Sequence, residues 1–197
     1  MKLHAATTNL FLLAIIGGLV GGLTVLHLTQ GTTTNPIATY YQSAAATLVS
    51  PHHLRKEMDL GHDHFILVDL RTQAEYEEEH IVGAINIDAS QPKEDLVAAF
   101  AELETLDKQI IIYCYSAACM TGRKVGAALS EEGIYVQELT IGWNEWRYDF
   151  NSWNYPNEWD QLDPNRYIVS GSEPGELAPI AEGELPPPCR IDGELGC

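Results

Sequence analysis

Two cysteines, Cys114 and Cys119, lie where a buried strand is predicted to end. Cys114 closes the apolar run at 110–114, and Cys119 follows just before a helix pattern that starts near Thr121. Backbone N–H groups of such a loop and the positive end of the helix stabilise a thiolate and hold an anion. The position therefore suits a reactive thiol, and an inert buried cysteine fits the same residues equally well.

Cys119 has two interpretations. As a thiolate it would attack a persulfide or a sulfenate on Cys114 and form a reversible disulfide. As a structural residue it would pack under the following helix. The other two cysteines, Cys189 and Cys197, are predicted to pair with each other in an oxidising compartment, which leaves Cys114 and Cys119 as the functional thiols.

The loop after Cys114 disfavours a cysteine-dependent phosphatase. Such an enzyme holds phosphate with an arginine six positions after its nucleophile, and Met120 occupies that position here. The first cation after the cysteine is Arg123. The predicted loop residues are Tyr115, Ser116, Ala117, Ala118, Cys119 and Met120.

Apolar runs and helix patterns alternate along the middle of the chain. The runs at 65–70 and 110–114 are almost continuously apolar, which is typical of strands buried on both faces, and a more polar strand is predicted at 134–139. Helix patterns occupy 93–106 and 121–132. The alternation predicts an α/β fold with an open parallel sheet, whose ligand site lies beyond the carboxyl ends of its strands.

Several motifs between Pro51 and Trp146 occur in the order found in rhodanese domains, which this part of the chain resembles. They are VDLR at 68–71 followed by Glu75-Tyr76, HIVGAINI at 80–87, IIIYC at 110–114, and a closing set of Gly133, Gly142 and Trp146. The resemblance implies a rhodanese-like domain over residues 51–150, with an open five-stranded parallel sheet and helices on both faces.

The resemblance also implies a sulfurtransferase that needs no cofactor. Cys114 would take a sulfane sulfur from a small donor such as thiosulfate, hold it as a persulfide and pass it to a thiol or a cyanide-like acceptor. Asp69 and Arg71 would then form a buried pair that organises the loop, because either charge would be costly to bury alone. Arg123 would be a further supporting residue, and His80 would be mainly structural.

The loop departs from the family pattern in its charge. Family loops often hold Arg or Lys and Gly soon after the cysteine, whereas this loop has no cation before Arg123. Its weakly positive lining counts against thiosulfate as the donor. Two alternatives to the enzyme therefore stay open: a non-catalytic rhodanese-like module that binds a partner protein or anions, and a thiol redox or relay protein that uses Cys114 and Cys119.

Charge is distributed very unevenly along the chain. The 197 residues contain 28 Asp and Glu against 11 Lys and Arg, a net charge of −17, yet no acidic residue precedes Glu57. Nucleic acids and anionic membrane surfaces need clustered cations, so the acidic body argues against both as partners. The same charge disfavours the capture of anionic sulfur donors.

The segment at 10–28 is apolar and carries no Asp, Glu, Lys or Arg. As a helix it would extend about 28 Å, close to the thickness of a bilayer core, which predicts a transmembrane helix or uncleaved signal anchor. Lys2 then places residues 1–9 in the cytoplasm and the body on the outer, periplasmic or extracellular, side. The alternative is a secreted protein whose leader is cleaved as a signal peptide. Residues 29–50 are predicted to form a linker and a helix.

The rest of the chain is predicted to be less regular. Aromatic side chains crowd the stretch at 143–159, and we expect residues 151–197 to form an aromatic-rich wrap over the body followed by an irregular acidic tail beyond Pro164. No metal site is predicted, because the spacing of the candidate ligands matches no defined site; they are His52, His53, His62, Asp63 and His64.

Overall fold

The structure is a computed structural model that describes Gly18, residues 35–156, Glu158 and residues 160–181. Its contacts divide the chain into two units, Met1–Ser43 and Ala44–Cys197, and the second is called the body below. Among the described residues no helix has both the length and the apolar character needed to cross a membrane.

Several sequence predictions fall outside the described residues. The apolar segment at 10–28 lies outside them except for Gly18, and so do Cys189 and Cys197. The anchor, its orientation and the tail disulfide therefore stay predictions. The helix expected within 29–50 is present as α2, Pro36–Thr47, and none of its residues is buried.

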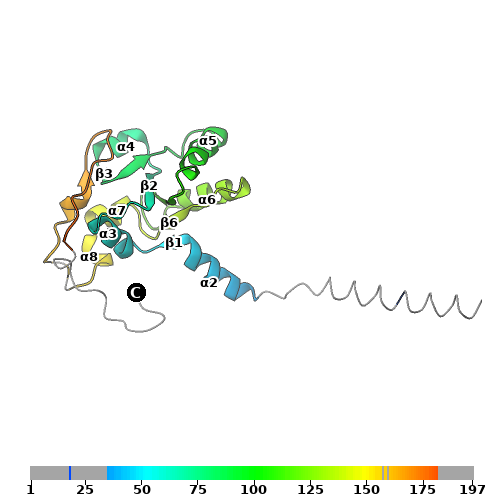
Figure 1. Ribbon diagram of the computed structural model, residues 1–197, viewed down its shortest axis with the longest axis horizontal. Coiled ribbons are helices and arrows are strands. Elements are labelled where there is room, and N and C mark those ends of the chain that lie inside the picture. Colours follow the sequence, from blue (N-terminus) through cyan, green and yellow to red (C-terminus); the bar gives the residue numbers. More distant parts are fainter. Residues whose placement is uncertain (1–17, 19–34, 157, 159, 182–197) are drawn as a thin grey trace, which may run out of the picture. The chain divides into compact units, whose positions relative to one another are not determined.

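A parallel sheet of five strands forms the centre of the described body, in the order β1-β6-β5-β2-β4. Every neighbouring pair in it is parallel, so the carboxyl ends of the strands share one edge. This confirms the predicted open parallel sheet (Figure 1). The strands are β1 (Leu48–Val49), β2 (Phe65–Asp69), β4 (Ala84–Asn86), β5 (Gln109–Tyr113) and β6 (Gln137–Leu139).

The central strand β5 is apolar on both faces because both faces are covered. Successive side chains of a strand point to opposite sides of the sheet. Accordingly, Ile111 and Tyr113 belong to one hydrophobic core, whereas Ile110, Ile112 and Cys114 belong to the other. The continuous apolar run in the sequence thus reports a strand between two layers of helix.

Helices cover the two faces of the sheet. One layer packs through side chains such as Phe100 and Leu129, and the other through Leu54 and Trp146, all of which are almost fully buried. The first layer consists of α5 (Lys93–Glu104) and α6 (Thr121–Glu131), and the second of α3 (Pro51–Asp59), α7 (Trp143–Tyr148) and α8 (Phe150–Trp153) (Figure 1). Helices on both faces were predicted, and the structure confirms them.

Two strands of the parallel sheet were not predicted from the sequence, and a third is shorter than predicted. β1 lies inside the stretch 29–50, and β4 lies inside the motif at 80–87. The strand predicted at 134–139 begins only at Gln137. Segments of two or three residues are too short to show a period of two, so periodicity could not identify them.

The chain beyond Pro164 differs from the irregular tail expected there. Pro164–Tyr167 form a 3-10 helix, and β7 (Ile168–Val169) pairs antiparallel with β3 (His80–Ile81). Tyr167 is fully buried, and its ring stacks on that of Phe150 with the centroids 5.8 Å apart. This part of the C-terminal segment therefore belongs to the folded body.

A buried ionic cluster fixes the C-terminal segment to α3. The guanidinium of Arg55 pairs with Asp59 at 2.9 Å and with Glu158 at 3.0 Å, and all three side chains are fully buried. The hydroxyl of Tyr167 donates to the Asp59 carboxylate at 3.0 Å. His52 Nε2 lies 3.1 Å from Glu158 Oε2. Ion pairs of this kind link the first helix of the body to residues more than a hundred positions later.

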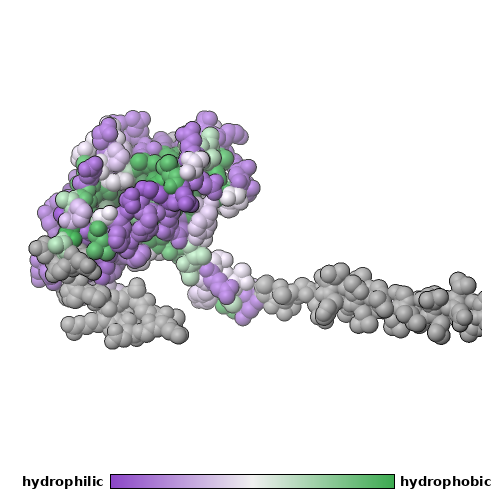
Figure 2. Space-filling view, in the orientation of Figure 1, coloured by the Kyte–Doolittle hydropathy of each residue, from purple (hydrophilic) through white to green (hydrophobic). Residues whose placement is uncertain are grey.

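The described surface of the body is largely hydrophilic on the face that Figure 2 draws. Figure 2 shows one face, on which hydrophilic residues cover most of the described area and hydrophobic residues appear between them.

Helix α4 (Gln73–Glu78), which joins β2 to β3, begins with a capping box in which Thr72 and Glu75 satisfy each other's backbone N–H groups.

Candidate active site

Cys114 lies directly after β5, at the edge of the sheet where the parallel strands end. Its side chain is buried, whereas Cys119 is partly exposed. The two sulfur atoms lie 2.6 Å apart, nearer than two thiols in van der Waals contact, and both cysteines are free. The structure thus brings the two predicted thiols together at the predicted edge.

A tight turn brings Cys119 back onto Cys114. The N–H of Cys119 donates to the carbonyl of Ser116 at 2.9 Å, which closes a four-residue turn within the loop. The rest of the loop is held from outside by two carboxylates. Glu75 accepts from the Tyr115 hydroxyl at 2.6 Å, and Glu145 accepts from the N–H of Ala117 at 3.2 Å.

The start of α7 is packed directly against this loop. The N–H of Trp143 donates to the carbonyl of Cys114 at 2.8 Å, and the N–H of Asn144 donates to that of Tyr115 at 2.9 Å. Gly142 makes the approach possible, because a Cβ at this position would lie 2.2 Å from the backbone nitrogen of Ser116. The backbone at Gly142 has a φ of −114°, so the requirement for glycine here is steric rather than conformational.

Cys114 and Cys119 open into a cavity of about 110 Å³. A water molecule takes about 30 Å³ in the liquid, so the cavity has room for an added sulfur atom or a small donor. Its charged lining side chains are Arg123 and Glu138, which pair at 3.5 Å. The lining residues are Leu48, Tyr113, Cys114, Ser116, Ala117, Cys119, Arg123, Glu138, Leu139, Thr140 and Ile141.

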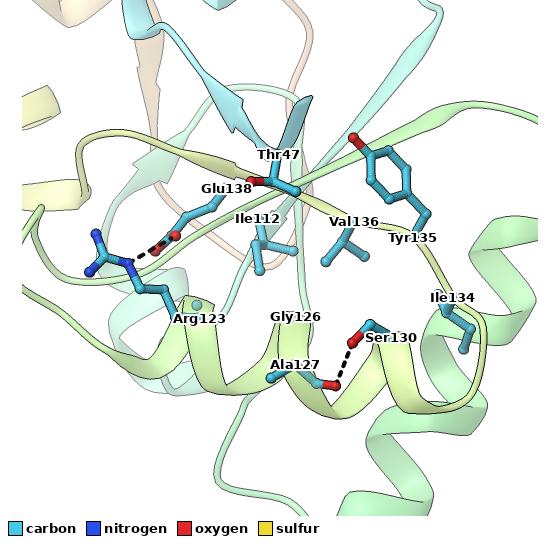
Figure 3. Close-up of a pocket in the computed structure, with 11 residues that line it drawn as sticks. Thr47, Ile112, Arg123, Gly126, Ala127, Ser130, Ile134, Tyr135, Val136 and Glu138 are labelled. Carbon is cyan, nitrogen blue, oxygen red and sulfur yellow. Dashed lines mark hydrogen bonds and ion pairs between the residues drawn. The ribbon is translucent and has the colours of Figure 1, made fainter. Parts of the chain in front are cut away.

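A second, larger pocket of about 300 Å³ adjoins this cavity between α6 and β6. Figure 3 shows the Arg123–Glu138 pair at one side of the pocket and Tyr135 with Ile134 at the other. The two spaces share Arg123 and Glu138 as lining residues. The ion pair therefore stands between the thiols and a mainly apolar pocket.

The environment of the two thiols is asymmetric. Burial raises the pKa of Cys114 to about 12, assisted by the hydrogen bond with Cys119 and opposed by the N–H of Tyr115 and the hydroxyl of Thr121. Burial also tends to raise the pKa of Cys119, but hydrogen bonds from Cys114 and Thr121 outweigh it and leave this pKa lowered. The first proton lost from the pair therefore leaves its charge on Cys119, the more exposed sulfur.

Glu138 is the acidic member of the cavity. Burial raises the pKa of its carboxyl, and the guanidinium of Arg123 opposes that shift. Its carboxylate lies against the first turn of α6, because a Cβ on Gly122 would be 2.8 Å from Glu138 Oε1. Arg123 is more than half exposed, so Glu138 brings negative charge to a cavity whose cation is turned partly to solvent.

Asp69 and Arg71 form the buried pair that the sequence predicted, with Arg71 Nη2 2.7 Å from Asp69 Oδ2. Tyr113 joins this pair to the cavity, because it is one of the residues that line the cavity and its hydroxyl donates to Asp69 at 2.6 Å. Arg71 also donates to the Glu79 carbonyl at 2.8 Å and lies over the Trp143 ring, 4.4 Å from its centroid. The pair thus ties β2 and β5 to the start of α7.

Several predicted loop residues are exposed, whereas His80 is buried. Tyr115, Ala118 and Met120 are exposed on the loop. His80 is fully buried, stacks on the Tyr76 ring at 3.7 Å and hydrogen-bonds its carbonyl at 2.7 Å through Nδ1. That environment fits a structural histidine.

The surface histidines lie away from the thiols. His62 Nδ1 is 2.8 Å and His64 Nε2 is 3.4 Å from Glu57 Oε2, and both histidines are about half exposed. They precede β2, so they lie at the amino edge of the sheet, opposite Cys114. His52 instead contacts Glu158 in the ionic cluster, and the absence of a metal stays a prediction.

Three carboxylates of the site were missed by the sequence analysis. Glu75 and Glu145 each stand three positions after the N-cap of a short helix, and the T-x-x-E spacing at 72–75 is a signal that the sequence does carry. Glu138 gave a weaker signal: it is an acidic residue within a predicted strand. Its position at the cavity follows from the register of β6 against β5, which pairs Glu138 with Ile112, two residues before Cys114.

Comparison with known proteins gives a family match over this domain and relatives that cover part of the chain. A model of the rhodanese-like domain family matches residues 50–149. The thiosulfate sulfurtransferase GlpE of Coxiella burnetii is 29% identical over 83 residues, which cover 42% of this chain and 71% of that protein. The crystal structure of the BH2092 protein from Bacillus halodurans is 30% identical and covers 59% of this chain and 83% of its own, with a TM-score of 0.49.

A relative of another kind is similar to part of the chain. The HTH-type transcriptional regulator Rv0324 of Mycobacterium tuberculosis is 40% identical over 81 residues, or 41% of this chain. The match spans only 34% of the regulator, so the chain corresponds to about a third of that protein.

Proposed function

Since the chain belongs to the rhodanese-like domain family, we propose that it is a sulfurtransferase that carries sulfane sulfur as a persulfide on Cys114. One observation carries the proposal: the Cys114 thiol opens into a cavity of about 110 Å³ at the carboxyl edge of the sheet. The N–H of Tyr115 and the hydroxyl of Thr121 hydrogen-bond its sulfur and partly offset the burial that raises the pKa of this thiol. A thiosulfate sulfurtransferase among the relatives supports the same chemistry.

The reaction needs two half-steps at one sulfur atom. The Cys114 thiolate attacks the sulfane sulfur of the donor, the donor leaves without that sulfur, and a persulfide forms in the cavity. An acceptor nucleophile then takes the outer sulfur and restores the thiolate. The loop is held by Glu75, Glu145 and the start of α7. The N–H and hydroxyl groups that hydrogen-bond the sulfur are therefore in place before the sulfur substrate binds.

Replacing Cys114 with Ser tests the proposal directly. Incubation of the full chain with polysulfide and cyanide should produce thiocyanate with wild type and only the background rate with Cys114→Ser. Because an inactive variant also results from misfolding, its unfolding midpoint in urea should match that of wild type. Equal thiocyanate production by the two proteins would refute the enzyme and favour a non-catalytic binding module.

Glu138 is expected to select against anionic donors. Glu138→Gln removes a negative charge from the cavity and leaves Arg123 free to attract the donor, so kcat/KM for thiosulfate should rise about tenfold at low ionic strength. A neutral organic trisulfide should react at nearly the wild-type rate. The matched control is Glu131→Gln, which changes an exposed carboxylate of α6 and should leave both values unchanged. If kcat/KM for thiosulfate does not rise in Glu138→Gln, Glu138 does not select against anionic donors.

Loading of sulfur onto Cys114 is expected to accelerate with pH. A thiol is protonated below its pKa, and the pKa of Cys114 is raised to about 12, so the thiolate fraction grows about tenfold per pH unit through neutral and mildly alkaline solution. The Cys119→Ala variant loses a hydrogen bond that raises this pKa, so its rate profile should shift to lower pH. Stopped-flow measurement of persulfide formation gives both profiles, and a wild-type rate independent of pH above neutrality would contradict this assignment.

A further inference from the structure

We propose that Cys119 resolves the Cys114 persulfide: it displaces the outer sulfur as hydrosulfide and leaves a Cys114–Cys119 disulfide. This activity rests on the proposed function, because it begins from the persulfide. It adds a second outcome to the site, in which the protein reduces the sulfane sulfur itself and does not hand it to an acceptor. The substrate class is then a sulfane-sulfur donor together with a dithiol reductant.

The positions of the two sulfurs carry the inference. Cys119 Sγ lies 2.6 Å from Cys114 Sγ, which is the atom that a resolving thiolate must attack. The turn closed between Ser116 and Cys119 holds this approach, and it involves backbone rather than a mobile side chain. Both cysteines also line the same cavity, so the outer sulfur of a persulfide has space to leave.

The charges around the pair favour the required direction of attack. Hydrogen bonds from Cys114 and Thr121 lower the pKa of Cys119, so Cys119 is the sulfur that is ready as a nucleophile. Thr121 reaches both sulfurs from the first turn of α6. The partly exposed Cys119 is also the sulfur that an external reductant reaches first.

The step balances in atoms and electrons. The Cys119 thiolate forms a bond to Cys114 Sγ, the bond between Sγ and the outer sulfur breaks, and the outer sulfur departs as hydrosulfide with the proton of the persulfide. The sulfane sulfur gains two electrons, which come from oxidation of the two cysteines to a disulfide. A small or protein dithiol then reduces that disulfide by exchange, becomes a disulfide itself and restores both thiols.

A single-turnover experiment without reductant isolates this step. Reduced full-length protein is loaded with polysulfide under nitrogen, desalted at once and left to stand, and free sulfide is measured with monobromobimane. Trypsin releases both cysteines in one peptide, Gln109–Arg123, whose mass distinguishes a persulfide, heavier by one sulfur, from an internal disulfide, lighter by two hydrogens. Wild type should release up to one sulfide per chain while this peptide changes from persulfide to disulfide.

Two variants decide the outcome. Cys119→Ser should keep its persulfide through the same interval and release at most a tenth of the wild-type sulfide, yet yield thiocyanate when cyanide is added. Cys189→Ser/Cys197→Ser removes the remaining two of the four cysteines and should behave as wild type. If wild type and Cys119→Ser hold a persulfide equally long, the resolving role is wrong and the sulfurtransferase stands. If no protein that retains Cys114 gains a sulfur, both proposals fail.

Discussion

Gly142→Ala is expected to lower the unfolding free energy by about 3 kcal/mol and the rate of sulfur transfer by about 100-fold. The added methyl group would lie 2.2 Å from Ser116 N, 2.4 Å from Ser116 Cα and 2.5 Å from the carbonyl carbon of Tyr115. All three are backbone atoms, so no side chain can rotate to relieve the clash. The loop must move away from α7, and the hydrogen bond of Trp143 N–H to the Cys114 carbonyl is then lost.

The matched control is Gly126→Ala in α6. A Cβ at Gly126 would lie 3.6 Å from Val136 Cγ2, an ordinary contact, and alanine stabilises a helix interior by about 0.5–1 kcal/mol relative to glycine. This variant should therefore unfold at slightly higher urea and keep wild-type thiocyanate production. Wild-type activity and stability in Gly142→Ala would show that the close approach of α7 to the loop does not position Cys114.

The position of Cys114 could be predicted because it depends on a long, strongly patterned element. The run that ends at Cys114 is apolar at successive positions, so both faces of the strand are apolar. This pattern is typical of a central strand in a sheet that is covered on both faces. Parallel strands then place their following loops at one edge. The resemblance to rhodanese domains placed Asp69 and Arg71 near the same edge, where β2 ends at Asp69, and their buried ion pair follows from the cost of burying either charge alone.

The partners of the site could not be predicted because they depend on register and on tertiary contacts. Glu138 reaches the cavity only because β6 pairs with β5 in one register, and a shift by one residue would turn its side chain to the other face of the sheet. Cys119 is a candidate because of its spacing from Cys114, but its approach to Cys114 depends on the turn between Ser116 and Cys119. The sequence Ser-Ala-Ala-Cys contains no Gly, Pro, Asn or Asp that would predict this turn. The spacing of two residues in the sequence limits how far apart they can lie, but it does not determine whether they are in contact.

Composition was misleading for the C-terminal segment. Residues rich in Gly, Pro and Glu predicted an irregular tail beyond Pro164, yet Tyr167 is fully buried and donates to Asp59. A strand of two residues has no detectable period, and the ion pair of Glu158 with Arg55 joins positions that no local pattern relates. The C-terminal segment is thus stabilised by contacts between residues that are distant in the sequence and meet only in the folded chain.

Arg55→Met is expected to cost about 3–5 kcal/mol of unfolding free energy at neutral pH, because it leaves two buried carboxylates, Asp59 and Glu158, without their shared cation. Burial already raises the pKa of Asp59, and loss of the guanidinium raises it further. A carboxyl whose folded pKa exceeds its unfolded value destabilises the fold above the folded pKa, and this penalty disappears as the pH falls below the unfolded pKa. The deficit of Arg55→Met relative to wild type should therefore shrink as the pH is lowered from 7 toward 4, as measured by urea unfolding followed through tryptophan fluorescence.

A compensated variant separates the ionic cluster from the packing of α3. Arg55→Met combined with Asp59→Leu and Glu158→Gln removes both carboxylates that lose the guanidinium and should recover most of the lost stability, because replacing buried ion pairs with neutral groups costs far less than breaking them. Lys56→Met, the neighbouring and less buried position, should change stability by only about 0.5 kcal/mol. If Arg55→Met alone is as stable as wild type, Asp59 and Glu158 do not need the guanidinium. The attachment of the C-terminal segment would then have to come from its aromatic contacts, such as the stacking of Tyr167 on Phe150.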